Sequence, residues 1–126
     1  MEWKLLFKAD REWVGPYLLG VAALHTVVGL GLFFPVLLEL VHRGWWDSVG
    51  EHPVRAAVVW FLLFGAPLAL LAWTVRPLQQ TGQWRALRPL GWGLLAMAAL
   101  GGSLMPVSGF WLVLPPAWAL CSAPRW

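Results

Sequence analysis

His25 is the residue of this sequence whose type and position are best suited to chemistry. It lies about 11 residues into an apolar run, near the middle of a bilayer if that run is a membrane-spanning helix. Ionisable side chains at such a depth are costly and usually face protein or water. The neighbouring Thr26 and Gly29 are small enough for another helix to approach closely. We therefore predict either a ligand, proton-relay or substrate contact at His25, or a neutral histidine hydrogen-bonded across a helix bundle.

Glu39 and His42 form a second candidate group in a polar stretch that follows the same run. They are three positions apart, so on a helix they would share one face. A carboxylate can orient and tune an imidazole, which suits a divalent cation or an acid–base couple. Metal sites normally have tighter and repeated ligand spacing, so the sequence predicts no metal. The alternative is a solvated loop with salt bridges, in which Arg55 pairs with one of the acids or extends toward lipid headgroups.

Ser103 and Ser108 are the hydroxyl candidates near the C-terminal end, the first before a short proline-containing connection and the second within it. Neither serine lies in a Gly-x-Ser-x-Gly elbow or a Ser-x-x-Lys motif. We therefore expect turn-stabilising hydroxyls rather than nucleophiles. In the same connection, residues 106–109 predict a tight turn, because Pro106 presets one turn position and Gly109 tolerates a left-handed one.

Two adjacent prolines, Pro115 and Pro116, interrupt the last apolar run. Each lacks a backbone donor, which predicts carbonyls without helical partners at Trp111 and Leu112. Freed groups of this kind are tolerated in a membrane only where protein or trapped water satisfies them. We therefore expect the turn at 106–109 to lie below the outer surface, with a recess above it. A simple proline kink packed between helices is the alternative.

The composition determines which elements must position these residues. Of the 126 residues, 60% are hydrophobic and 12% charged, whereas soluble domains usually carry about 25% charged residues. The chain therefore belongs in a bilayer, as a single integral membrane domain over residues 1–126. We predict an all-α fold, a four-helix transmembrane bundle of two hairpins. Its expected transmembrane helices lie near 14–38, 54–75, 88–105 and 109–123.

The distribution of basic residues predicts the orientation of the bundle. Lysine and arginine near the spans are retained on the cytoplasmic side. One side of the predicted bundle carries seven of them: Lys4, Lys8, Arg11, Arg76, Arg85, Arg88 and Arg125. The other side carries Arg43 and Arg55 alone. Both termini are therefore expected in the cytoplasm. Because these basic residues flank apolar spans, no nucleic-acid partner is predicted.

Three segments carry a resemblance to a known family. They are "LHTVVGL" at 24–30, "WFLLFGAPLAL" at 60–70 and "PLGWGLLAMAALGGSLMPVSGFWLVLP" at 89–115. Over roughly residues 14–120, the chain resembles a family of small bacterial four-helix integral membrane proteins of unknown function. The resemblance implies a multi-pass protein of the bacterial inner membrane. It implies no activity and no catalytic residues.

From these features we expect binding of a small apolar or amphiphilic molecule, such as a lipid, isoprenoid or quinone, in an outward recess. The candidate ligand-binding residues are His25, Thr26, Gly29, Glu39, His42, Ser103, Ser108 and Trp111. An integral-membrane enzyme acting on such a molecule is the first alternative. An accessory subunit or small transporter working as a homo-oligomer is the second. The expected partners are the lipid bilayer and this ligand, and the sequence assigns no cofactor.

Overall fold

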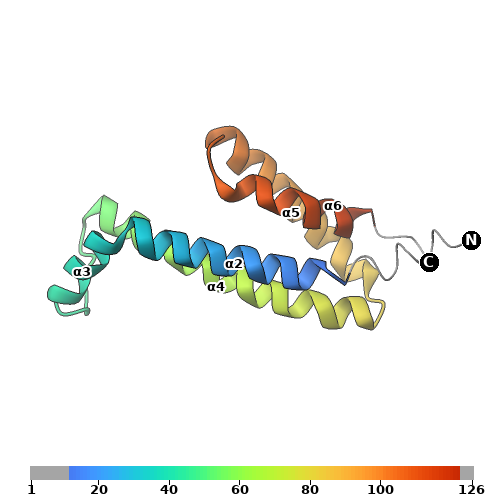
Figure 1. The fold of residues 1–126 in the computed structure, drawn as a ribbon, viewed down its shortest axis with the longest axis horizontal. Coiled ribbons are helices and arrows are strands. Elements are labelled where there is room, and N and C mark those ends of the chain that lie inside the picture. Colours follow the sequence, from blue (N-terminus) through green and yellow to red (C-terminus); the bar gives the residue numbers. More distant parts are fainter. Residues whose placement is uncertain (1–11, 123–126) are drawn as a thin grey trace, which may run out of the picture.

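The computed structural model describes residues 12–122, and every regular element in that range is a helix. Figure 1 shows α2 (Val14–Leu32), α3 (Phe34–His42), α4 (Pro53–Gln80), α5 (Trp84–Leu104), the 3-10 helix η1 (Gly109–Val113) and α6 (Leu114–Cys121). The predicted all-helical class is confirmed over this range. By length and composition, α2 and α4 are long and apolar enough to cross a membrane. Four of the basic residues used for the orientation lie outside the described residues: Lys4, Lys8, Arg11 and Arg125.

The structure has two helices where the sequence predicts one near 14–38. α2 ends at Leu32, and Phe33 leaves the helical conformation with φ −107° and ψ 15° before α3 begins. Pro35 lies in the first turn of α3, where its missing N–H costs no helical hydrogen bond. In a continuous helix the same ring would clash with the carbonyl of Gly31. The break therefore follows from the position of this proline.

The last apolar run is interrupted, as its prolines predict, and forms two short helices in place of the single one expected near 109–123. Residues 109–113 are a 3-10 helix, and Pro115 and Pro116 lie in the first turn of α6. There a proline is tolerated because the first amides of a helix need no intrahelical acceptor. The backbone N–H of Leu114 donates to the carbonyl of Trp111. The Trp111 carbonyl thus lacks the α-helical partner that Pro115 cannot supply, as predicted, and is satisfied by this 3-10 hydrogen bond instead.

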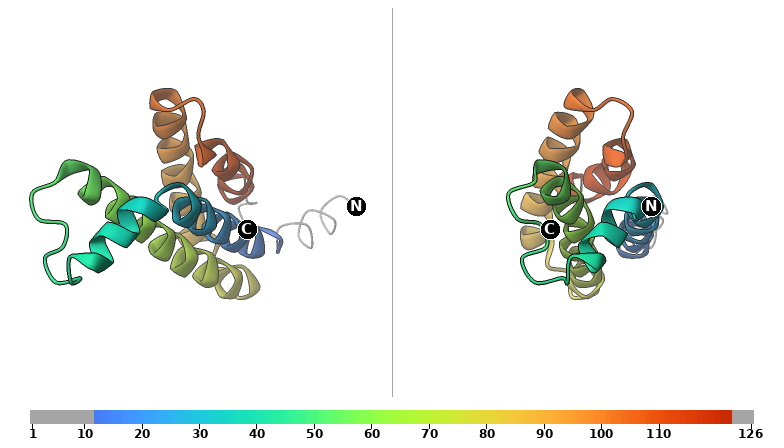
Figure 2. Two further views of the ribbon diagram at one scale, coloured as in Figure 1. Left: turned by 60° about the vertical axis from the view of Figure 1, so that its left-hand side comes forward. Right: turned by 90° about the vertical axis from the view of Figure 1, so that its left-hand side faces the viewer.

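The helices pair as two hairpins. α2 runs antiparallel to α4, and α5 packs against η1 and α6 (Figure 1). The two hairpins meet near the start of α2 and diverge from there, so that the end of α5 lies away from the α2–α4 pair (Figures 1 and 2). α3 extends the first hairpin well beyond the end of the second along the long axis of the molecule (Figure 1).

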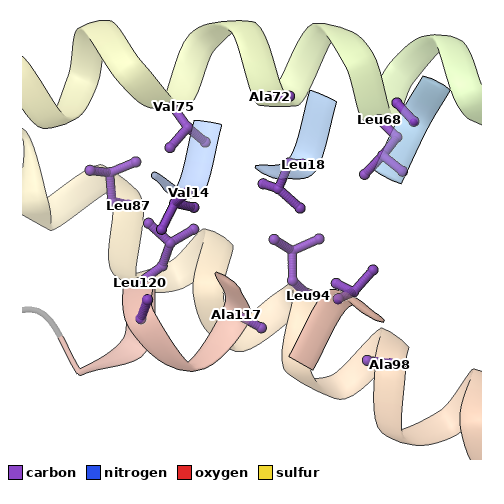
Figure 3. Packing of buried hydrophobic residues seen from close by; sticks show 13 residues of the cluster. Val14, Leu18, Leu68, Ala72, Val75, Leu87, Leu94, Ala98, Ala117 and Leu120 are labelled. Atoms are coloured by element: carbon purple, nitrogen blue, oxygen red, sulfur yellow. The ribbon is translucent and has the colours of Figure 1, made fainter. Parts of the chain in front are cut away.

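The buried core lies where the two hairpins meet. Figure 3 shows side chains from α2 and α4 facing side chains from α5 and α6 across this junction. The fully buried members with large side chains are Val14, Leu18, Val75, Leu87 and Leu120. On α2 this cluster extends only as far as Ala22. α4 is the main neighbour of α2, and the candidate site begins beyond Ala22.

Candidate functional site

His25 lies one helical turn beyond the end of the core and is half-buried against α4. Its Nε2 is 2.6 Å from the backbone carbonyl oxygen of Phe61. The imidazole also stacks on the Phe61 ring, with centroids 4.1 Å apart and 23° between the planes. The Phe64 ring meets it edge-on at 5.8 Å. The predicted hydrogen bond of His25 across the bundle is therefore present, within the α2–α4 hairpin.

Two glycines bring the helices together around this histidine. A methyl group built on Gly65 of α4 would come within 2.8 Å of the Thr26 hydroxyl and 3.4 Å of the His25 ring. One built on Gly29 of α2 would come within 2.6 Å of Leu62. The small-residue face predicted beside His25 thus permits close approach of α4. The Thr26 hydroxyl donates to the carbonyl of Ala22, at 3.0 Å.

Glu39 and His42 lie on α3, away from His25, and Glu39 pairs with Arg55 rather than with His42. Arg55 Nε donates to Glu39 Oε1 at 3.0 Å, and Arg55 Nη2 contacts the same oxygen. This hydrogen-bonded guanidinium holds the pKa of the Glu39 carboxyl below its ordinary value, with smaller electrostatic contributions from Arg55, His52 and Arg43. Within residues 12–122, no hydrogen bond joins Glu39 to His42. The salt-bridged loop fits this part of the structure better than an acid–base couple.

The loop between α3 and α4 has a defined backbone path. Arg43 Nε donates to the Ser48 carbonyl at 3.0 Å, and Ser48 is buried. Gly44 and Gly50 have positive φ angles, as do Trp45 at 68° and Asp47 at 47°. Left-handed backbone is unusual for a residue as large as tryptophan. Among the described residues, the glycines with positive φ are Gly44 and Gly50 in this loop and Gly82. Gly109 does not have the left-handed conformation that the sequence predicted for it.

The candidates near the connection between α5 and η1 make local hydrogen bonds with backbone. They are Ser103, Ser108 and Trp111. Ser103 donates to the Leu100 carbonyl at 2.8 Å, and Ser108 accepts from the Phe110 N–H at 3.4 Å. The Trp111 indole Nε1 donates to the Pro106 carbonyl at 2.8 Å. Ser108 and Trp111 thus bond to backbone in and beside the connection, which agrees with the turn-stabilising role predicted for Ser108, whereas the Ser103 bond lies within α5.

The eight candidate residues thus form three separate groups. His25, Thr26 and Gly29 face α4, Glu39 and His42 lie on α3, and the other three lie at the α5–η1 connection. Sequence reasoning missed Phe61 and Gly65, which complete the first group. A glycine within an apolar run was the available signal for Gly65, whereas a backbone carbonyl partner leaves no signature of residue type. Within the described range, no three His, Cys, Asp or Glu side chains cluster to hold a metal ion.

Comparison with known proteins gives one match. A model described as a family of unknown function (DUF6463) matches residues 9–125. No curated protein and no solved structure matches the chain. The matched range includes all three groups of candidate residues.

Proposed function

The chain belongs to the DUF6463 family of unknown function, and from this premise we propose that it is a multi-pass protein of the bacterial inner membrane that binds a small amphiphilic molecule beside His25. The observation that carries the proposal is the setting of His25. It is a polar side chain, half-buried and fixed to α4, and its surroundings in the α2–α4 hairpin are apolar apart from Thr26.

The exposure of the long helices supports the membrane part of the proposal. In the most apolar 18-residue stretch of each helix, only 28% of α2 and 22% of α4 is buried within the molecule. The core helix of a soluble protein buries its apolar side chains, whereas a membrane helix presents them to lipid. Trp60 is 73% exposed and Leu32 68% exposed. Apolar surface on this scale requires an apolar environment.

The shape of the molecule supports a ligand beside His25. The second hairpin is shorter and diverges from the first beyond the shared core (Figure 1). His25 lies in the part of α2–α4 that contributes no residue to the shared core, beyond Ala22 on α2 and before Leu68 on α4. A few polar groups in aromatic and aliphatic surroundings are typical of sites for small amphiphilic molecules. We propose that the ligand lies here, in the outward recess.

The excess of basic residues supports an orientation with the α3–α4 loop outside and the α4–α5 loop in the cytoplasm. We test it with two single cysteines, Glu51→Cys and Gln80→Cys, in a Cys121→Ala background, because both positions are exposed. A membrane-impermeant thiol reagent added to intact cells should label position 51 and not position 80. Labelling at position 80 alone would contradict the orientation.

Native mass spectrometry of the gently purified protein tests the binding function. We expect a bound small molecule on the wild-type protein and its loss in His25→Leu. The matched control is Thr74→Val, which removes a hydroxyl that donates to the Leu71 carbonyl on the exposed side of α4. The control should retain the molecule. A wild-type protein without any adduct, or a His25→Leu variant that keeps it, would refute the proposal.

A further inference from the structure

The two polar side chains beside Gly65 have both committed their donors to the backbone. The Phe61 carbonyl oxygen can only accept a hydrogen bond, so the proton of the His25–Phe61 contact belongs to Nε2. The Thr26 hydroxyl has a single hydrogen, which it donates to the Ala22 carbonyl. Neither side chain therefore has a donor left for a ligand while these two bonds are in place.

His25 and Thr26 can each still accept a hydrogen bond from a ligand. α2, α4, α5 and α6 contain no aspartate or glutamate. These helices therefore offer no carboxylate to pair with an imidazolium, and the neutral imidazole carries a single N–H. With Nε2 protonated, Nδ1 of a neutral imidazole carries a lone pair. Thr26 likewise keeps oxygen lone pairs after donating its hydrogen.

The His25 Nδ1 atom is reachable from outside the molecule. Within residues 12–122, this nitrogen makes no hydrogen bond, and it is not among the side-chain atoms that are both fully buried and unpartnered. It therefore retains accessible surface on a half-buried ring. The surrounding wall is aromatic, with Phe61 stacked on the imidazole and Phe64 at its edge.

We infer that the molecule bound beside His25 is an uncharged amphiphile whose head carries a hydroxyl donor, that is, an alcohol, phenol or quinol. This inference rests on the proposed binding function and specifies its ligand. A ketone, ether or oxidised quinone offers only acceptors, which would face the acceptors of His25 and Thr26. A phosphate or carboxylate head would find no cation among residues 14–32 of α2.

Discrimination of this kind has a clear physical basis. A site that supplies one half of a hydrogen bond rejects an analogue lacking the other half, because a polar group is then desolvated without compensation. The discriminating feature is the donor hydrogen rather than size or shape. Two probes that differ in that hydrogen alone can therefore isolate it.

The test compares 4-octylphenol with its methyl ether, 4-octylanisole. Both have the same ring and chain, and only the phenol can donate. Dissociation constants are measured by native mass spectrometry titration of the full-length protein in mild detergent. We expect wild-type protein to prefer the phenol about tenfold, as one hydrogen bond of ordinary strength provides. Thr74→Val should retain this preference.

Two variants at His25 separate the hydrogen bond from the surrounding apolar surface. His25→Leu should bind both probes equally weakly, no more tightly than wild-type protein binds the ether, because leucine offers no acceptor. His25→Gln should restore part of the preference, since its amide nitrogen can donate to Phe61 while its oxygen accepts from the phenol. Thermal melts on the same preparations verify that each variant is folded.

The possible results distinguish this inference from the proposed function. If wild-type protein binds both probes equally, or prefers the ether, and His25→Leu binds neither, the donor requirement is refuted while the binding site stands. If wild-type protein binds neither probe, both proposals fail. The comparison of the two probes on wild-type protein needs no variant, so the inference remains testable even if His25→Leu does not fold.

Discussion

The two hairpins achieve close helix contact by different means. In the α2–α4 hairpin, Gly65 faces the Thr26 hydroxyl and the edge of the His25 ring. In the second hairpin, Gly91 of α5 faces backbone atoms of α6, with a built methyl group only 2.7 Å from the Cys121 nitrogen. Gly101 and Gly102 of α5 lie against the aromatic rings of η1. Polar side chains thus lie at one of the close contacts of the first hairpin, at Gly65, whereas backbone and aromatic rings lie at the close contacts of the second.

This difference separates a rigid element from an adaptable one. A contact made by backbone cannot move without shifting a whole helix, whereas a hydroxyl or an imidazole can rotate. The second hairpin therefore suits a structural role, and it also supplies half of the shared core. The first hairpin keeps polar side chains at the place where it leaves that core. The four predictions below test this comparison.

The largest effect is expected at Gly91. In Gly91→Ala, the new methyl group would meet the Cys121 nitrogen, the Leu120 side chain and the Ala117 carbonyl, two of which are backbone. Overpacking against atoms that cannot move should lower the free energy of unfolding by about 3 kcal/mol. Denaturation of the purified protein in detergent measures the loss.

Gly93 provides the matched control on the same helix. No atom lies within 4 Å of a methyl group built there. Gly93→Ala should leave stability unchanged or raise it by up to about 1 kcal/mol, because alanine favours a helix more than glycine does. Equal losses in the two variants would show that α5 and α6 do not pack as described.

A smaller effect is expected at Gly65, because its nearest neighbour is a side chain. Gly65→Ala should displace the Thr26 hydroxyl and break its bond to Ala22, at a cost of about 1–2 kcal/mol. In a Thr26→Ala background, the same substitution should cost less, with a coupling energy of about 0.5–1 kcal/mol. Strict additivity in this double-mutant cycle would contradict the contact, and a loss as large as that of Gly91→Ala would remove the contrast between the hairpins.

The sequence predicted the helices better than their contacts. The apolar runs near 54–75 and 88–105 correspond to α4 and α5, although α4 continues to Gln80 and α5 begins at Trp84. The break at Phe33 was missed although Pro35 signals it, because the apolar run continues across both helices. The depth of His25 indicated a contact across helices. Its partner is a backbone carbonyl, which any residue could supply, so Phe61 could not be predicted.

The separation of the candidate residues into three groups was also outside the reach of sequence reasoning. Residues at the outer ends of adjacent spans are expected to lie near one another. The divergence of the hairpins separates η1, which contains Trp111, from α3, which contains Glu39 (Figure 1), and this depends on where the core packs rather than on any local pattern. The pairing of Arg55 with Glu39 was one of two alternatives that the charges allowed.

A third prediction concerns the stability that His25 contributes without ligand. His25→Leu removes the hydrogen bond to Phe61 and keeps an apolar side chain. Hydrogen bonds between membrane helices contribute about 0.6 kcal/mol on average and rarely more than about 1.7 kcal/mol. We expect a loss in that range, measured by denaturation of ligand-free protein. A loss above about 3 kcal/mol would instead make His25 a main structural contact of the first hairpin, since about 1.4 kcal/mol already corresponds to a tenfold change in an equilibrium constant.

The smallest effect is expected at the far end of the first hairpin, where an ion pair joins α3 to α4. The second hairpin ends with an indole–carbonyl bond between Trp111 and Pro106, which does not titrate. The Glu39 carboxyl has a pKa below its ordinary value of 4.5 because Arg55 stabilises its charged form. Its contribution is therefore complete above about pH 4.5, declines below it, and disappears once the pH falls below the folded-state pKa.

Thermal melts between pH 7 and about pH 3 measure this contribution by comparing wild-type protein with Glu39→Gln. The wild-type melting temperature should fall more steeply with acid than that of the variant, and the two curves should converge at the acidic end. The effect should be small and should weaken with added salt, because Glu39 is solvent-exposed and exposed ion pairs contribute little. Parallel curves would show that the Glu39–Arg55 ion pair does not stabilise this end of the first hairpin. A steeper fall in Glu39→Gln would assign the acid sensitivity of the hairpin to another group.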